Sequence, residues 1–178
     1  MVKILFVCHG NICRSPMAEF VMKKLVAKEL GCKSTPSDNG VLHAENFGEK
    51  LPCEFDARDF EIASAATSTE EIGNPVYPPA RRMLAAHGID CSGKYARQVT
   101  AHDLAYYDYI VLMDQNNLRN MRRMFGADKI TQKISLLMEW AGSSRDVADP
   151  WYTGNFEATW SDVNEGCRAL LKTILEGQ

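Results

Sequence analysis

Cys8 and Arg14 lie six positions apart near the N-terminus, and both side chains are suited to phosphate chemistry. A thiolate is a strong nucleophile, and a guanidinium can bind two phosphate oxygens at once. The apolar run 4–7 predicts a buried strand, and the Ser-Pro pair at 15–16 predicts the start of a helix. We therefore expect the segment from Cys8 to Arg14 to be a strand-to-helix loop.

Such a loop is a natural anion site, because the first N–H groups of a helix have no partner within it and the helix dipole is positive there. Gly10 permits backbone conformations closed to other residues, and Asn11 tolerates a left-handed one, so the amides can turn inward around a phosphate. The same field favours the thiolate form of Cys8. The Ser15 hydroxyl can cap the helix or donate to this thiolate. The expected phosphate-binding residues are His9, Gly10, Asn11, Ile12, Cys13 and Ser15.

Cleavage of a phosphate ester also requires a proton for the departing oxygen. The segment 147–154, Val-Ala-Asp-Pro-Trp-Tyr-Thr-Gly, offers Asp149 beside Trp151. Partial desolvation by the indole ring favours the protonated form of a carboxyl group, as a general acid needs. An ordinary Asp-Pro turn with exposed aromatic residues also explains this segment, and Asp146 is a rival acid.

The run Val-Cys-His-Gly-Asn-Ile-Cys-Arg-Ser-Pro-Met-Ala-Glu, which begins at position 7, resembles the phosphate-binding loop of the low-molecular-weight protein tyrosine phosphatases. The resemblance implies that Cys8 is the nucleophile and that Arg14 binds the transferring phosphoryl group. These phosphatases carry a similar Asp-Pro-Tyr-Tyr-Gly loop, which assigns the general acid to Asp149. Trp151 and Tyr152 then form an aromatic lip over the substrate ring.

The resemblance also implies supporting contacts. Ser64 and His87 correspond to residues that hydrogen-bond Asn11, and Asp114 corresponds to a residue that fixes Arg14. From the residues alone, His87 is a histidine that stabilises a helix end, and Asp114 is the N-cap of the helix that follows it.

Three further positions bear on specificity and redox behaviour. Family members often carry an aromatic residue before Gly73, where this chain has Thr-Glu-Glu at 69–71, so we expect an acidic wall that disfavours acidic peptides. Relatives that act on phosphoarginine carry Thr at the position of Ile12, and the bulkier Ile favours phosphotyrosine. Cys13 is placed to capture an oxidised Cys8 as a disulfide, although a plain buried thiol is equally compatible with the sequence.

The composition predicts one soluble domain over residues 1–178. With 20 basic and 23 acidic residues, the net charge of −3 favours neither nucleic acid nor an anionic membrane as a partner. We find no apolar run of membrane-spanning length and no signal peptide. Six cysteines without a C-x-x-C pair fit reduced thiols and a cytoplasmic location.

Apolar periodicity predicts strands that alternate with helices. A polar insertion at about 32–58 interrupts the pattern. Alternating elements predict an α/β domain of three layers, in which helices cover both faces of a parallel sheet and ligands bind at the carboxyl ends of the strands. The pattern does not order the four strands, and the resemblance implies the order 2-1-3-4. The expected strands are 4–7, 60–66, 109–113 and 133–137, and the expected helices are 16–30, 79–87, 101–107, 115–124 and 156–174.

We predict a phosphatase that hydrolyses protein phosphotyrosine or small aryl phosphates through a phosphocysteine intermediate, without a metal or other cofactor. A cognate tyrosine kinase is a candidate partner. One alternative is a thiol-linked arsenate reductase, but such enzymes need a pair of shuttle cysteines in a later loop, and residues 60–178 offer only Cys91 and Cys167. The other is a phosphopeptide-binding protein without catalysis, which has no need for Asp149.

Overall fold

The computed structural model describes residues 1–30, 57–129 and 132–177. The predicted insertion at 32–58 therefore lies almost entirely outside the described residues. Among the residues described, no helix combines the length and the apolarity needed to cross a membrane.

Four parallel strands form one sheet in the order β2-β1-β3-β4, which confirms the predicted order 2-1-3-4. Cys8 at the end of β1 pairs with Ala66 at the end of β2, and Val7 pairs with Leu112 of β3. These strand ends share one edge of the sheet, so the loops that follow them meet there. The strands are β1 (Val2–Cys8), β2 (Phe60–Ala66), β3 (Tyr109–Leu112) and β4 (Ile134–Leu136).

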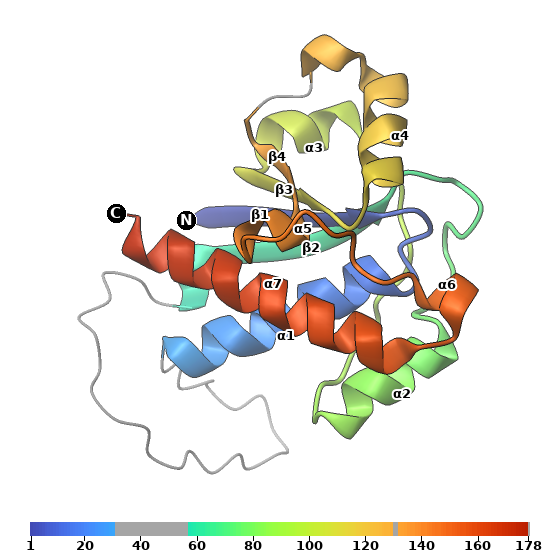
Figure 1. Cartoon of the computed structure of the whole chain (residues 1–178), viewed down its shortest axis with the longest axis vertical. Coiled ribbons are helices and arrows are strands. Elements are labelled where there is room, and N and C mark those ends of the chain that lie inside the picture. The colour runs from blue at the N-terminus through green and yellow to red at the C-terminus, as the bar shows by residue number, and fades with distance from the viewer. Residues whose placement is uncertain (31–56, 130–131, 178) are drawn as a thin grey trace.

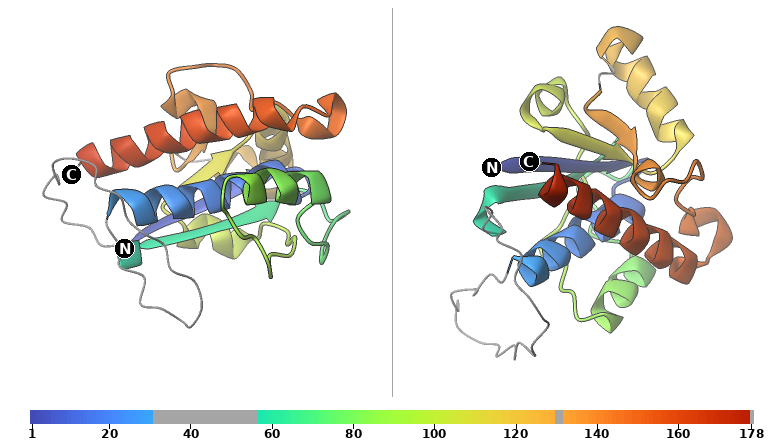
Figure 2. Two further views of the ribbon diagram at one scale, coloured as in Figure 1. Left: turned by 90° about the horizontal axis from the view of Figure 1, so that it is seen from below. Right: turned by 60° about the vertical axis from the view of Figure 1, so that its left-hand side comes forward.

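Helices cover both faces of the sheet, as predicted (Figures 1 and 2). One face carries α1 (Arg14–Glu29), α2 (Pro78–Ala86) and α7 (Phe156–Glu176). The other carries α3 (Ala101–Tyr106) and α4 (Gln115–Phe125). The short elements are α5 (Leu137–Trp140), α6 (Pro150–Thr153), η1 (Ala57–Asp59) and η2 (Ala127–Lys129).

The alternation of side chains along β1 divides the core into two clusters. Ile4 and Phe6 are buried against the helices of the first face, and Leu5 and Val7 against those of the second. Apolar residues recur along one face of α7, and this face packs mainly on α1 and α5 rather than directly on the sheet. Its buried apolar residues are Val163, Cys167, Leu170, Leu171 and Ile174.

Most element boundaries agree with the prediction to within two residues, as expected for helix ends that fray. Sequence reasoning missed the four short elements α5, α6, η1 and η2. Of these, α6 is a single turn within the predicted loop 147–154. It lies at the edge of the sheet where the strands end (Figure 1). Pro150 begins this turn and Gly154 ends it in a left-handed conformation, the usual arrangement of these two residue types.

Candidate active site

The loop between β1 and α1 curls around the Cys8 sulfur. Asn11 adopts the predicted left-handed conformation (φ 58°), and its backbone N–H donates to Cys8 Sγ at 3.3 Å. We predicted that Gly10 is present because it permits a backbone conformation closed to other residues. This explanation is wrong, because Gly10 does not have a positive φ. A Cβ at Gly10 would lie 3.2 Å from Glu71 Cγ, so a larger residue there would make the Glu71 side chain shift by a few tenths of an ångström.

The Ser15 hydroxyl lies beside the Cys8 sulfur and does not cap the helix. Ser15 Oγ is 3.0 Å from Cys8 Sγ, and α1 has no side-chain cap. Asn11 Nδ2 donates to Ser15 Oγ at 2.9 Å, so the serine proton can point either to the sulfur or to Ala65 O, which lies 3.4 Å from Ser15 Oγ. An N–H and an O–H can therefore both stabilise a thiolate at Cys8.

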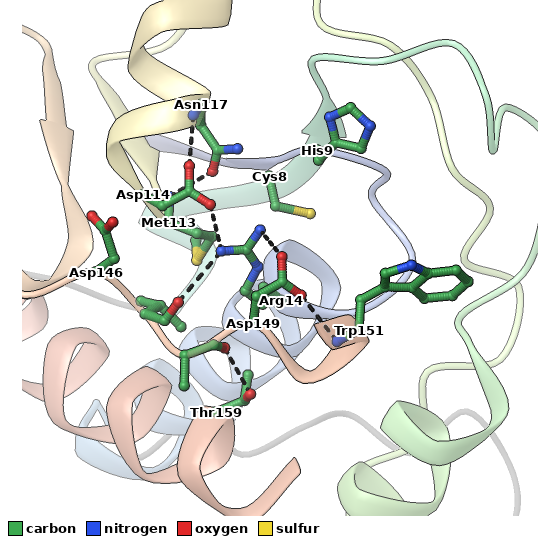
Figure 3. Close-up of polar contacts among 12 residues, drawn as sticks. Cys8, His9, Arg14, Met113, Asp114, Asn117, Asp146, Asp149, Trp151 and Thr159 are labelled. Carbon is green, nitrogen blue, oxygen red and sulfur yellow. Dashed lines mark hydrogen bonds and ion pairs between the residues drawn. The ribbon is translucent and has the colours of Figure 1, made fainter. Parts of the chain in front are cut away.

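Arg14 is buried between two carboxylates (Figure 3). Its Nη1 lies 2.6 Å from Asp114 Oδ2, and its Nη2 lies 2.6 Å from Asp149 Oδ2. Burial alone would lower the pKa of Arg14, but the negative groups at Cys8, Asp114 and Asp149 raise it above its ordinary value. The guanidinium is therefore a permanent cation at the base of the site.

Asp114 both holds Arg14 and caps the N-terminus of α4, the two functions that the sequence analysis considered for it. Its Oδ2 holds Arg14, as expected from the resemblance, and its Oδ1 accepts a hydrogen bond from the N–H of Asn117 in the first turn of α4. Asn117 in turn accepts from Met113 N through Oδ1 at 3.2 Å. The end of β3 and the start of α4 thus fix the orientation of the arginine together.

Asp149, rather than Asp146, lies at the site. Asp149 Oδ1 accepts from Trp151 N at 3.0 Å, which caps α6, while its Oδ2 contacts Arg14. Asp146 Oδ1 accepts from Gln115 N at 3.1 Å, and Figure 3 shows its carboxylate beyond Asp114, away from Cys8.

Buried hydrogen bonds fix the backbone just before Asp149. Val147 N donates to Met113 O at 2.9 Å, and Ala148 N donates to Asp162 Oδ2 at 2.9 Å. The hydroxyl of Thr159, a fully buried residue of α7, donates to Ala148 O at 2.8 Å. Sequence reasoning missed Thr159 and Asp162, although a polar residue within the apolar stripe of α7 was a usable signal.

Asn11 is held on both sides of its amide. Its Nδ2 donates to Ser64 Oγ at 2.8 Å, the contact expected for Ser64. The Ser64 hydroxyl donates a hydrogen bond to Glu19 Oε2 at 2.6 Å, and Arg97 N donates to Asn11 Oδ1 at 3.2 Å. The strained loop residue is therefore tied to α1, to β2 and to the segment before α3.

The expected contact between His87 and Asn11 is wrong. His87 is the C-cap residue of α2, its Nδ1 lies 2.9 Å from Met83 O, and its ring stacks on Trp160 with centroids 3.8 Å apart. The interpretation from the residues alone, a histidine at a helix end, describes this position better.

Lys94 supplies the positive charge next to the Asn11 network. Its Nζ lies 3.0 Å from Ser64 O and 3.3 Å from Glu19 Oε2. Burial lowers the pKa of Lys94, and the charge of Glu19 partly offsets this effect. Lys94 did not stand out in the sequence, because a single charged residue in a turn is common. Glu19 ends the run that carries the family resemblance, but it was given no role there.

A pocket of about 180 Å³ opens above the sulfur, lined by residues from three segments of the chain. Trp151 and Tyr152 lie at its mouth, as expected for the aromatic lip, and the Trp151 ring lies 5.6 Å from that of Tyr77. Glu70 and Glu71 form the predicted acidic wall. The lining residues are Cys8, His9, Gly10, Ile12, Cys13, Arg14, Glu70, Glu71, Asp149, Trp151 and Tyr152.

Four cysteines among the described residues are free and buried: Cys8, Cys13, Cys91 and Cys167. Burial, reinforced by the charge of Cys8, raises the pKa of Cys13 to about 12. Burial also raises the pKa of Cys91 and Cys167. Of the four, only Cys8 and Cys13 line the pocket.

The pocket thus combines a thiol, a fixed guanidinium, the N-terminus of α1 and a carboxyl group. Amides and guanidinium stabilise negative charge on oxygens, and a carboxyl group on the wall can exchange a proton with a bound ester. This arrangement is suited to displacement at a tetrahedral oxyanion centre.

Comparison with known proteins agrees with this chemistry. The model of the family described as low molecular weight phosphotyrosine protein phosphatase matches residues 3–44 and 41–178. The chain is 37% identical to low molecular weight protein-tyrosine-phosphatase YfkJ of Bacillus subtilis, over 98% of this chain and 96% of that protein. It is 36% identical to the low molecular weight phosphotyrosine protein phosphatase of Rattus norvegicus, over 95% and 93%. The crystal structure of YfkJ superposes with a TM-score of 0.81, covering 100% of this chain and 97% of that one at 36% identity.

Proposed function

The chain belongs to the low molecular weight phosphotyrosine protein phosphatase family, and we propose that it hydrolyses phosphotyrosine and aryl phosphate monoesters through a phosphocysteine intermediate. The observation that carries this proposal is the meeting of Cys8, Arg14 and Asp149 in one pocket.

In the first step, Cys8 Sγ attacks the phosphorus atom, a sulfur–phosphorus bond forms, and the bond to the phenolic oxygen breaks. Arg14 and the loop amides bind the three oxygens that do not leave, where negative charge is concentrated. Asn11 N and Ser15 Oγ, both within hydrogen-bonding distance of the sulfur, support its thiolate form.

Asp149 acts twice in this mechanism. Its protonated form donates to the leaving phenolate in the first step, and its ionised form removes a proton from the water that hydrolyses phosphocysteine in the second. Because Asp149 Oδ2 contacts Arg14 Nη2, a phosphate that takes both guanidinium nitrogens on the pocket side displaces the carboxyl group. The displaced group is then free to face the leaving oxygen.

Trp151 and Tyr152 are proposed to pack on the substrate ring. Their side chains are 58% and 86% exposed at the pocket mouth, so a bound aromatic ring would bury apolar surface that faces water. Ile12, which also lines the pocket, fits the preference for phosphotyrosine over phosphoarginine that the sequence predicts.

The direct test is hydrolysis of p-nitrophenyl phosphate by the wild-type protein and by Cys8→Ser. We expect turnover by the wild type and none by the variant, because a hydroxyl in this site is a far weaker nucleophile than a thiolate. Equal turnover by the two proteins would refute the assignment of Cys8.

The two alternative functions predict different results. An arsenate reductase would reduce arsenate with thioredoxin and leave esters intact, and a binding protein would hold a phosphopeptide without releasing phenol. Substrate proteins, and the proposed cognate tyrosine kinase among them, can be identified by trapping in a lysate with Cys8→Ser.

A further inference from the structure

The mouth of the pocket carries more negative than positive charge. Glu70 and Glu71 line it together with Asp149, whereas the cationic groups there are Arg14 at the base and the titratable His9. Arg14 is already paired with two carboxylates. A dianionic phosphate gains nothing from additional carboxylates near it, so the two glutamates call for a separate explanation.

The segment that carries the glutamates is fixed to the phosphate-binding loop. Thr67 N donates to Cys8 O at 2.9 Å, and Ser68 N donates to His9 O at 3.0 Å. The Ser68 hydroxyl accepts from Glu70 N at 3.0 Å and tightens the turn. The position of Glu70 relative to a bound phosphate is therefore set by backbone hydrogen bonds.

The two carboxylates are held differently. Glu71 Oε2 accepts from Asn74 Nδ2 at 2.7 Å, and its side chain packs over Gly10. Glu70 Oε2 lies 3.2 Å from His9 Nε2, in a pair whose side chains are 74% and 53% exposed. Such an exposed pair is worth little, so Glu70 can exchange His9 for a cation of the substrate.

A substrate phosphate on Cys8 and Arg14 directs its ester group outward, between the wall that carries Glu70 and the lip formed by Trp151. Figure 3 shows His9, the partner of Glu70, on the opposite side of the Cys8 sulfur from the Trp151 backbone. Because Glu70 lines the pocket and its side chain is exposed, residues that flank a bound phosphotyrosine can pass beside it. Carboxylates there attract Lys and Arg and repel Asp and Glu.

We propose that Glu70 and Glu71 select substrates in which basic residues flank the phosphotyrosine. The proposal rests on the proposed function and names its substrate class. The sequence predicted only that an acidic wall disfavours acidic peptides. The fixed turn and the dissociable His9 contact now indicate a site that binds a cationic side chain.

The test compares kcat/KM for two phosphotyrosine peptides that differ only in carrying Lys or Glu on both sides of the phosphotyrosine. We expect the wild type to prefer the Lys peptide by about 10-fold at low ionic strength, and the preference to shrink with added salt. In the double variant Glu70→Gln/Glu71→Gln, the ratio of kcat/KM for the Lys peptide to that for the Glu peptide should fall to about 2-fold or less. The amides keep the size of the side chains but remove their charge.

Glu29→Gln is the matched control. It removes one carboxylate at the far end of α1, roughly 22 Å along the helix from Arg14, and should leave both the ratio and p-nitrophenyl phosphate turnover unchanged. A wild-type preference for the Glu peptide, equal rates for both peptides, or a Lys preference that survives in the double variant would overturn the proposal.

The outcome is separable from the proposed function. Turnover of p-nitrophenyl phosphate reports on catalysis alone, whatever the peptide ratio. The same ratio measured as binding affinity to Cys8→Ser reports on the acidic wall alone, even if the protein hydrolyses no ester.

Discussion

Asp149 Oδ2 lies 2.6 Å from Arg14 Nη2, so the proposed general acid and the proposed phosphate-binding cation contact each other directly. The acid is therefore placed by the same guanidinium that the substrate must bind. In the proposed mechanism this shared contact couples substrate binding to release of the acid, and it leads to two predictions about Asp149.

Asp149→Asn should lower kcat for phenyl phosphate by about 10² to 10⁴, because the poor leaving group needs a proton. The loss for p-nitrophenyl phosphate should be smaller, since nitrophenolate departs more readily without one. Steady-state rates on both esters test this. The control is Asp146→Asn, which alters a carboxylate bonded to Gln115 N outside the pocket. Equal losses on the two esters, or full activity, would contradict the assignment.

Asp149→Asn should also bind inorganic phosphate more tightly. The substitution removes the carboxylate that competes for Arg14 Nη2 and repels an anion, so we expect the inhibition constant for phosphate to fall by about 5-fold, on the order of 1 kcal/mol. Competition with p-nitrophenyl phosphate measures this constant. Weaker phosphate binding would show that Asp149 supports the anion rather than competing with it.

Local sequence patterns predicted most of the fold and half of the site. The bounds of β2 were predicted correctly at 60–66 because strand residues and turn residues are adjacent in the sequence there. The Cys8 to Arg14 loop is equally local. The approach of Asp149 to Arg14 is not local, and beforehand only the neighbouring Trp151 and the family resemblance favoured Asp149 over Asp146.

The incorrect prediction for His87 has a physical cause. The residues after α2 pass through two glycines with positive φ, Gly88 and Gly93, and this path carries Lys94 to Ser64 and Glu19. Backbone turns of this kind decide which side chain returns to the site. They cannot be inferred from a histidine in a plausible position.

Lys94→Met should therefore weaken the site, whereas His87→Gln should not. We expect Lys94→Met to lower the free energy of unfolding by about 1 to 3 kcal/mol and to reduce kcat more than it changes KM, because Ser64 and Asn11 lose a charged support. Glu19 retains Lys23 at 2.6 Å, which limits the loss. Urea unfolding and steady-state kinetics measure both effects. The conservative variant Lys94→Arg keeps the positive charge and should have a kcat close to that of the wild type. A larger kcat loss in His87→Gln than in Lys94→Met would contradict this account.

Cys13 should protect Cys8 from permanent oxidation. Peroxide converts Cys8 to a sulfenic acid, which condenses with the Cys13 thiol to a disulfide and releases water. We expect dithiothreitol to restore activity after peroxide treatment in the wild type and in Cys91→Ala, but not in Cys13→Ser. Because burial keeps the pKa of Cys13 at about 12, the disulfide should form faster as the pH rises. Full recovery of Cys13→Ser would rule out this role.

The most direct test of the central claim is acid quenching of the protein during turnover of ³²P-labelled p-nitrophenyl phosphate, followed by mapping of the label. We predict a phosphoryl group on Cys8 in the wild type, more of it in Asp149→Ala if hydrolysis of the intermediate slows more than its formation, and none in Cys8→Ser. Label on another residue, or steady release of nitrophenol by Cys8→Ser, would contradict the phosphocysteine mechanism.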